Sequence, residues 1–270
     1  GILNRLRENG VCKTVILRII SLFFLFGVYV FMAGCAATSD DHDPTTGREV
    51  AEIYEEASSL LKSGDYEGAI ALYERLEARF PYGKYAERAQ MEIAYAYYKD
   101  SEPESAILAA DRFIKLHPNH PNIDYMYYLR GLASYDLGES FLQGLFDVDP
   151  SQHDPKSARR AFEYFAELVK KFPKSRYSKD AIQRMALIRN NLAKYEVHVA
   201  NFYMRRGAYL AAANRGKYVV ENYQRTPAVA DALAIMVQAY DKLGMAELAQ
   251  DTRRVLQLNH PQHELLRKSK

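Results

Sequence analysis

The histidine and aspartate side chains of this sequence come closest to the types and spacing that catalysis or metal binding needs. His117 and His120 have the i, i+3 spacing of two metal ligands on one helical face, but Pro118 breaks the helix that would align their rings. Asp147 and Asp149 could form the carboxylate pair of a hydrolase, yet two aspartates at i, i+2 in a loop seldom converge on one reacting atom. The sequence holds no GxSxG turn, no HExxH helix and no glycine-rich phosphate-binding loop. We therefore expect no catalytic residues and no bound metal.

A different chemistry is open to the thiol of Cys35. Both cysteines, Cys12 and Cys35, lie within the first 35 residues, so the folded body can form no disulfide and no cysteine-ligated metal site. Residues 19–32 form an uncharged apolar run of 14 residues. As a helix this run would extend about 21 Å, less than the roughly 30 Å hydrocarbon core of a bilayer, which favours a secretory signal over a spanning helix. The sequence Met32-Ala33-Gly34-Cys35 then resembles a bacterial lipobox; a free cysteine after a signal anchor is the alternative.

The lipobox resemblance implies cleavage before Cys35 and attachment of lipid to its thiol. Residues 1–34 are then a lipoprotein signal peptide, and residues 35–50 are the lipidated cysteine and a flexible polar tether. A diacylglyceryl group with a further N-acyl chain exceeds the two signals that stable anchoring takes. Ala36 follows the cysteine, and by the convention for such lipoproteins the absence of Asp there points to the outer membrane. We expect no cofactor other than this covalent lipid.

The overall composition is that of an ordinary globular protein. In 270 residues, 48% hydrophobic content is enough to bury a sizeable core. The 36 Lys and Arg residues nearly balance the 34 Asp and Glu residues, leaving a formal charge of +2. This balance argues against a dedicated nucleic-acid binder or a polybasic membrane-surface protein. We expect no nucleic-acid partner.

From residue 51 onward, small residues, aromatic residues and prolines recur at fixed offsets. Counted from Ala69, a small residue lies 12 positions before, an aromatic residue 4 after, a leucine 7 after and a proline 12 after. Most of these offsets recur around Ala106 and Ala249 and, with changes, around Ala161 and Ala212. Tetratricopeptide repeats need small residues at these positions for close helix crossing, aromatic residues for wedging and a proline that ends the second helix.

Two repeats depart from the pattern. Around Ala212, Gln224 stands where the proline is expected; around Ala161, the small residue is Gly131, thirty positions earlier, so the third repeat carries an insertion of eighteen residues. The irregular stretch 138–154 belongs to this insertion, and its apolar residues either dock on the repeat core or touch a partner. These residues are Phe141, Leu142, Leu145 and Phe146. The sequence therefore predicts an all-α fold, a right-handed superhelix of five tetratricopeptide-like helix pairs around a groove that binds another polypeptide.

Six stretches are more specific than the repeat consensus, among them the sequence HPNHPNIDY. They are residues 80–85, 94–99, 111–125, 129–132, 146–149 and 192–196. Together they resemble the BamD family, also called ComL-like, lipoproteins of the machinery that assembles outer-membrane β-barrels. The resemblance extends from Cys35 to about residue 257. It implies a non-catalytic scaffold on the periplasmic face of the outer membrane, where accessory assembly lipoproteins are further partners.

The resemblance also divides the chain into two working parts. Residues 51–191, the N-terminal repeats, would receive the aromatic-ended C-terminal segment of unfolded outer-membrane proteins. Residues 192–270, the C-terminal repeats, would dock the periplasmic domain of the barrel-forming subunit. A different repeat lipoprotein of the envelope, such as a pilus-assembly pilotin or a cell-division coordinator, is the competing interpretation. Such a protein would lack the insertion and the HPNHPNIDY sequence.

Two sets of contact residues follow from the resemblance. An extended peptide needs partners for its backbone, an aromatic side chain needs a slot lined by rings, and a terminal carboxylate suits arginine. The predicted substrate pocket consists of Tyr82, Tyr85, Tyr97, Tyr98, Arg112, Asn122, Tyr125 and Arg130. The predicted partner-docking residues are Arg206, Tyr209, Asn214 and Arg215.

Overall fold

The computed structural model describes residue 45, residues 47–143 and residues 155–267. The chain divides into residues 1–47 and a helical body of residues 48–270. The predicted signal peptide, Cys35 and most of the tether lie outside the described residues, as do Asp147 and Asp149 of the insertion. Their predicted roles stay predictions.

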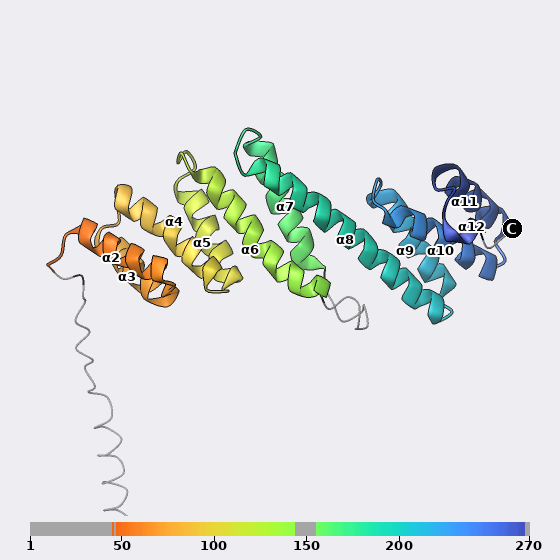
Figure 1. Cartoon of the computed structure of the whole chain (residues 1–270), viewed down its shortest axis with the longest axis horizontal. Coiled ribbons are helices and arrows are strands. Elements are labelled where there is room, and N and C mark those ends of the chain that lie inside the picture. Colours follow the sequence, from red (N-terminus) through yellow and green to blue (C-terminus); the bar gives the residue numbers. More distant parts are fainter. Residues whose placement is uncertain (1–44, 46, 144–154, 268–270) are drawn as a thin grey trace, which may run out of the picture. The chain divides into compact units, whose positions relative to one another are not determined.

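The described body is built from α-helices, which confirms the predicted all-α class (Figure 1). In chain order the helices are α2 (Val50–Ser63), α3 (Tyr66–Arg79), α4 (Lys84–Lys99), α5 (Pro103–Leu116), α6 (Ile123–Gln143), α7 (Lys156–Lys171), α8 (Ser178–Arg205), α9 (Tyr209–Asn222), α10 (Ala228–Lys242), α11 (Ala246–Asn259) and α12 (Glu264–Arg267). The described part of the chain contains no β-strand. None of the described helices combines the length and apolar character that crossing a bilayer requires.

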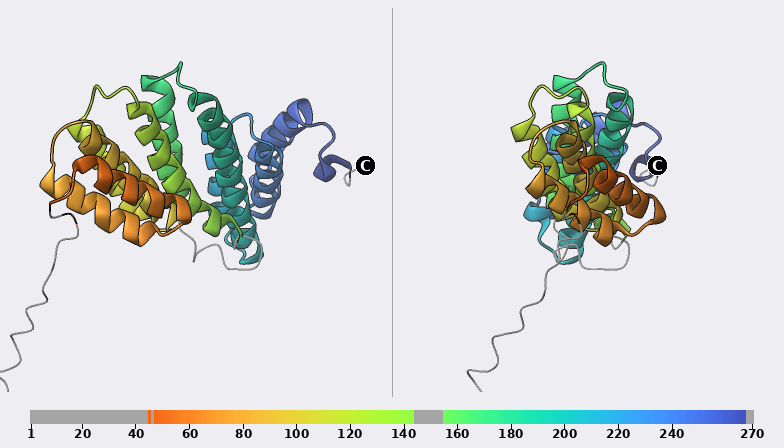
Figure 2. Two further views of the ribbon diagram at one scale, coloured as in Figure 1. Left: turned by 60° about the vertical axis from the view of Figure 1, so that its left-hand side comes forward. Right: turned by 90° about the vertical axis from the view of Figure 1, so that its left-hand side faces the viewer.

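From α2 to α11, helices that follow one another in the chain pack against each other as antiparallel neighbours (Figures 1 and 2). The even-numbered helices α2, α4, α6, α8 and α10 also contact one another in that order, so they form one layer of the body. This arrangement of helix pairs is that of tetratricopeptide-like repeats, as predicted. The number of repeats, the handedness of the superhelix and the insertion in the third repeat stay predictions.

The turn between α2 and α3 shows how the sequence ends one helix and begins the next. Gly64 follows α2 with a left-handed φ of 88°, which a glycine adopts without steric cost. The amide of Asp65 donates to the carbonyl oxygen of Leu60 at 3.0 Å. The Asp65 carboxylate then accepts from the amide of Gly68 at 2.9 Å and caps α3. Local side chains thus set the short turn that holds the pair together.

The small residues predicted at the helix crossings are fully buried, as close packing of helix axes requires. Ala57, Ala69 and Ala106 have no exposed surface. Gly131 of α6 lies against the ring of Phe165 of α7, and a Cβ atom at residue 131 would lie 2.5 Å from the Phe165 Cε1 atom. A larger residue at position 131 would force the Phe165 ring to move, so glycine allows α6 and α7 to cross this closely.

The boundary predicted between residues 191 and 192 falls inside α8, which runs without a break from Ser178 to Arg205. Residues on both sides of the boundary belong to one compact unit, residues 48–270. The two predicted working parts are thus joined through a continuous helix. Their separate roles stay predictions.

Candidate peptide-binding and docking sites

A cavity of about 850 Å³ opens on the layer of even-numbered helices. Its walls come from α2, α4, the start of α6 and the turn before α8. The lining residues are Tyr54, Arg88, Met91, Glu92, Tyr95, Pro121, Asn122, Asp124, Tyr125, Arg176 and Tyr177. Phenol rings, two guanidinium groups and an amide thus face one space. Rings and polar groups in this mixture suit a peptide, with the rings contacting side chains and the polar groups contacting its backbone or terminus.

The tyrosines of the cavity are held by further rings behind them. The ring of Tyr54 lies 5.6 Å from that of Tyr73 and 5.5 Å from that of Tyr85, measured between centroids. Tyr177 contacts Tyr125 at 5.6 Å and stacks on Tyr128 at 4.8 Å. Packed rings lose little conformational entropy when a ligand binds, so this wall is pre-organised.

Burial favours the neutral forms of two groups in the cavity wall. It raises the pKa of Glu92, although Lys62 and Arg88 act in the opposite direction. Burial also raises the pKa of Tyr125, and the nearby Glu92 carboxylate adds to that effect. The Tyr125 phenol therefore keeps its proton and can donate a hydrogen bond to a bound peptide.

Of the eight predicted pocket residues, the structure places Asn122 and Tyr125 in the cavity wall. Tyr85 lies one layer behind, against Tyr54. Tyr82, in the turn before α4, is 91% exposed. Tyr97 donates a hydrogen bond to Glu74 at 3.3 Å. These positions do not test whether the residues bind a substrate.

The other three predicted residues, Tyr98, Arg112 and Arg130, have acidic partners. Burial and then a hydrogen bond with Asp136 raise the pKa of Tyr98 to about 12. Arg112 is paired with Glu77. None of the three belongs to the cavity wall described above. Their substrate contacts stay predictions.

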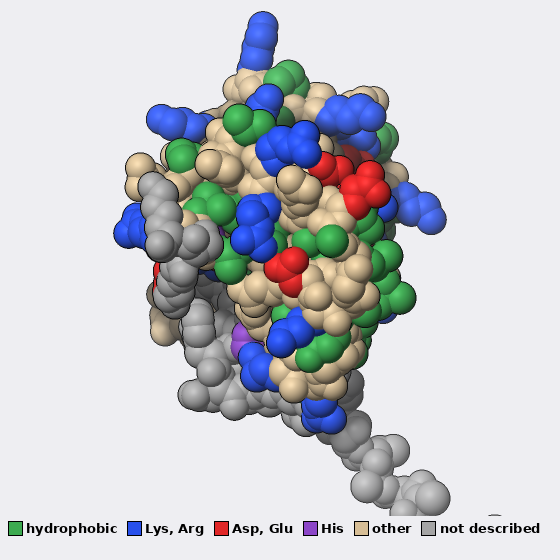
Figure 3. Space-filling view, turned by 90° about the vertical axis from the view of Figure 1, so that its right-hand side faces the viewer, with side chains coloured by type: hydrophobic (Ala, Val, Ile, Leu, Met, Phe, Trp, Pro, Cys, Tyr) green, Lys and Arg blue, Asp and Glu red, His purple; other side chains and the backbone are tan. Residues whose placement is uncertain are grey.

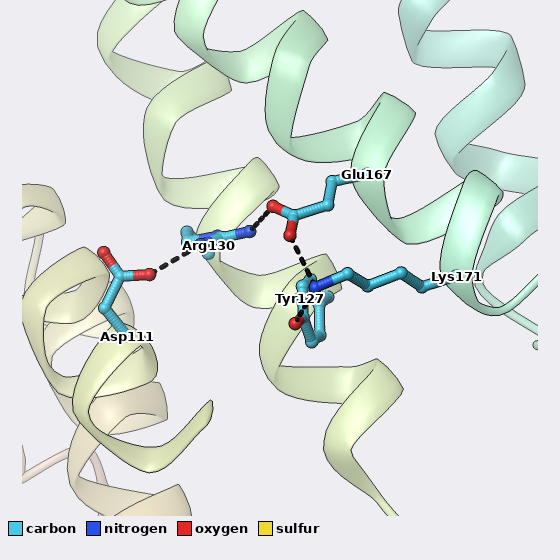
Figure 4. Close-up of polar contacts among 5 residues, drawn as sticks. All are labelled: Asp111, Tyr127, Arg130, Glu167 and Lys171. Atoms are coloured by element: carbon cyan, nitrogen blue, oxygen red, sulfur yellow. Dashed lines mark hydrogen bonds and ion pairs between the residues drawn. The ribbon is translucent and has the colours of Figure 1, made fainter. Parts of the chain in front are cut away.

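Arg130 lies at the centre of a polar network that joins α5, α6 and α7 (Figure 4). Its guanidinium pairs with Asp111 at 2.6 Å and with Glu167 at 2.5 Å. Lys171 Nζ lies 2.8 Å from Glu167 and donates to the Tyr127 hydroxyl at 2.8 Å. The Arg130 side chain is 9% exposed, and within the described body its Nε has no hydrogen-bond partner. Arg130 therefore connects three helices from a nearly buried position.

Sequence reasoning missed most of the cavity wall. The missed residues are Tyr54, Arg88, Met91, Glu92, Tyr95, Pro121, Asp124, Arg176 and Tyr177. A usable signal was present in α4, because Arg88, Met91, Glu92 and Tyr95 follow the i, i+3, i+4, i+7 spacing of one helical face. The first helix of each pair lines the inner layer of such repeats, so this face could have been found from spacing alone.

The four predicted docking residues lie at the end of α8 and along α9. Arg206 caps α8, with its guanidinium 4.9 Å from the Phe202 ring centroid. Tyr209 packs beside the buried residues of α9, whereas Asn214 is exposed. Arg215 pairs with Glu196 of α8 at 2.9 Å. Their binding role stays a prediction.

Figure 3 shows the end of the body where α11 and α12 lie, with Lys and Arg side chains spread among hydrophobic ones. On α11, Leu248, Val255 and Leu258 are exposed, the last of them by 77%. They lie at i, i+7 and i+10, on one helical face.

The histidine pair considered in the sequence does not form a two-ligand site. His117 Nε2 lies 2.8 Å from Gln90 Oε1, whereas His120 Nδ1 accepts from the amide of Asn122. Both imidazoles pack on the ring of Phe113. Among the described residues, no group of three or more His, Cys, Asp and Glu residues could hold a metal ion.

Comparison with known proteins shows the family to which the chain belongs. The family YfiO, described as outer membrane lipoprotein, matches residues 47–256. "Outer membrane protein assembly factor BamD" of Neisseria meningitidis serogroup A is 46% identical over 87% of this chain and 89% of its own length. The protein of the same name from Xylella fastidiosa Temecula1 is 38% identical over 92% of this chain and 85% of its own. Among solved structures, the kinesin light chain TPR-like repeats of Podosopora anserina cover 79% of this chain and 97% of their own, with 15% identity and a TM-score of 0.35. The family match spans well over half of the chain, and these relatives agree with it. The chain therefore belongs to the YfiO family of outer membrane lipoproteins, in agreement with the BamD-family resemblance of its sequence.

Proposed function

We propose that this protein is an outer-membrane protein assembly factor that binds other polypeptides and catalyses no reaction. The names of its relatives and the tetratricopeptide-like arrangement of its helix pairs support this role. Stacked helix pairs of this kind use an extended inner surface to bind partners. In this proposal the protein works in the complex that inserts β-barrels into the outer membrane.

The cavity on α2, α4 and α6 carries the proposal, because it combines tyrosine rings with Arg88 and Arg176. An unfolded barrel protein that ends in an aromatic residue offers a ring, an extended backbone and a terminal carboxylate. The rings of the cavity suit the aromatic side chain, and its amide and phenol groups suit the extended backbone. Its guanidinium groups suit the terminal carboxylate. Unfolded outer-membrane proteins are thus the proposed substrates of this cavity.

The remaining parts of the proposal concern position and partners. A lipid on Cys35 would hold the body at the periplasmic face of the outer membrane, with no other cofactor. Residues Arg206, Tyr209, Asn214 and Arg215 would dock the periplasmic domain of the barrel-forming subunit. Accessory assembly lipoproteins would bind elsewhere on the body. Both the anchor and the partners follow from the family resemblance and stand as proposals.

Replacing Tyr95 by alanine tests the cavity. The variant should bind a fluorescent peptide with a C-terminal aromatic residue at least about tenfold more weakly, because a ring of the wall is lost. Tyr218→Ala is the matched control, since Tyr218 is an exposed tyrosine of α9 that belongs neither to the cavity wall nor to the predicted pocket residues. Fluorescence anisotropy with the detergent-solubilised full-length protein measures both. Equal affinities for wild type and Tyr95→Ala would remove the cavity from the proposal, and amidating the peptide terminus tests the role of its carboxylate.

Replacing Arg215 by glutamate tests the docking surface. The variant should no longer copurify with the barrel-forming subunit, because a like charge then faces the acidic group that Arg215 would meet. Its helical circular dichroism should match that of wild type. Lys217→Glu, a charge reversal at an exposed residue of the same helix, should leave copurification intact. If Arg215→Glu still copurifies, Arg215 has no docking role.

A further inference from the structure

A buried carboxylate holds two arginines at the surface where α7, α8 and α9 meet. Glu196 of α8 is 1% exposed, and its two oxygens face different guanidinium groups. Arg159 of α7 lies 3.3 Å from Oε1, and Arg215 of α9 lies 2.9 Å from Oε2. Each arginine side chain remains 44% exposed. The cluster therefore has its negative charge inside and its positive charges at the surface.

We infer that Arg159, Glu196 and Arg215 form one cationic site that binds a carboxylate of the docked partner, with Glu196 as the residue that positions both guanidinium groups. This inference rests on the proposed docking role of Arg215. It adds Arg159, which lies on the other side of residue 191 and outside the docking region that the sequence predicts. The site thus draws on both parts of the body.

The charge balance explains why Glu196 is needed. Two guanidinium groups close together repel each other. A carboxylate between them attracts both and offsets that repulsion. Two positive charges and one negative charge leave an excess of one positive charge. Because Glu196 is buried, this excess is offered to the solvent-facing side. A carboxylate from a partner would neutralise it and could accept hydrogen bonds from the guanidinium N–H groups that Glu196 does not use.

The Arg130 network has the opposite arrangement, which makes it a useful contrast. There a nearly buried arginine is flanked by Asp111 and Glu167, whose side chains are partly exposed. That network offers carboxylates to the surface, whereas the Glu196 site offers guanidinium groups. Arg159 also lies near Tyr223, whose ring contacts that of the exposed Tyr218 at 5.8 Å between centroids. Arginine beside tyrosine is a combination enriched at protein interfaces.

Glu196→Gln tests the positioning role, since it keeps the shape of the side chain and removes its charge. The variant and wild type should be compared for binding to the purified periplasmic domain of a barrel-forming subunit, with the full-length protein in detergent. We expect at least a tenfold loss of affinity with unchanged helical circular dichroism. The affinity of wild type should fall as salt rises. Because Glu196→Gln carries one more net positive charge than wild type, a loss of affinity in this variant identifies positioning rather than net charge as the role of Glu196, and a gain of affinity would overturn that role.

Arg159→Gln provides a second test that leaves the Glu196 carboxylate and its pairing with Arg215 in place. It should also lose at least tenfold in affinity, whereas Arg159→Lys, which keeps the charge, should recover part of the loss. If wild type does not bind the periplasmic domain, the proposed docking function fails. If wild type binds and Arg215→Glu does not, but Glu196→Gln and Arg159→Gln both bind like wild type, the paired site is rejected and Arg215 acts alone.

Discussion

Arg130→Ala should lower the free energy of unfolding by about 3 kcal/mol, the lower end of the cost of breaking a buried ion pair. The lower end applies because Asp111 and Glu167 keep part of their exposure to water. The substitution also removes the side chain that packs on Tyr164, whose ring centroid lies 4.1 Å from the guanidinium carbon. Urea denaturation followed by circular dichroism measures the change.

Two companion variants separate charge from packing. Arg130→Met keeps most of the apolar stem and should be less destabilising than Arg130→Ala. Arg112→Ala removes an exposed arginine of the neighbouring α5 and its pairing with Glu77, and should cost less than about 1 kcal/mol. If Arg130→Ala and Arg112→Ala cost the same, the network of Figure 4 does not stabilise the body.

The contribution of Arg130 should depend on pH. Burial alone would raise the pKa of Glu167, but hydrogen bonds from Lys171 and Arg130 lower it below its ordinary value of 4.5. A depressed carboxyl pKa adds stability that is present above pH 4.5 and is lost as the pH falls through the folded-state pKa. The difference in unfolding free energy between wild type and Arg130→Ala should therefore narrow below pH 4.5.

Phe165→Ala should cost about 3–5 kcal/mol, because the fully buried ring leaves a cavity between α6 and α7. Gly131 of α6 lies directly against this ring. Gly131→Ala in the wild-type protein should cost roughly 1–3 kcal/mol, since its new Cβ would lie 2.5 Å from a ring carbon and the ring must move. Both values come from chemical denaturation.

The double variant gives a sharper result, because the effect of Gly131→Ala should change sign. Once Phe165 is alanine, the new methyl group enters empty space, and alanine favours a helix over glycine by about 0.8–1.0 kcal/mol. Gly131→Ala should then stabilise the Phe165→Ala protein. Additive costs in this double-mutant cycle would mean that Gly131 and Phe165 do not oppose each other across the crossing.

The sequence by itself determined the class of fold and the positions of close packing. Small residues, aromatic residues and prolines at fixed offsets are local features, and residues a few positions apart in a helix share a face whatever the rest of the chain does. Ala57, Ala69 and Gly131 were found in this way, and all three lie at helix crossings. The specific stretches also indicated the family, which the comparison confirms.

Only the tertiary structure decided the environments of the charged side chains. Arginine is usually a surface residue, so the sequence does not distinguish Arg130 from Arg215. Arg130 is nearly buried between two acidic side chains, whereas Arg215 is exposed and pairs with the buried Glu196. Their partners lie on different helices, with Glu196 19 positions from Arg215 and Glu167 37 positions from Arg130. Helical spacing relates residues within one helix, whereas the burial of a charge depends on which helices come together around it.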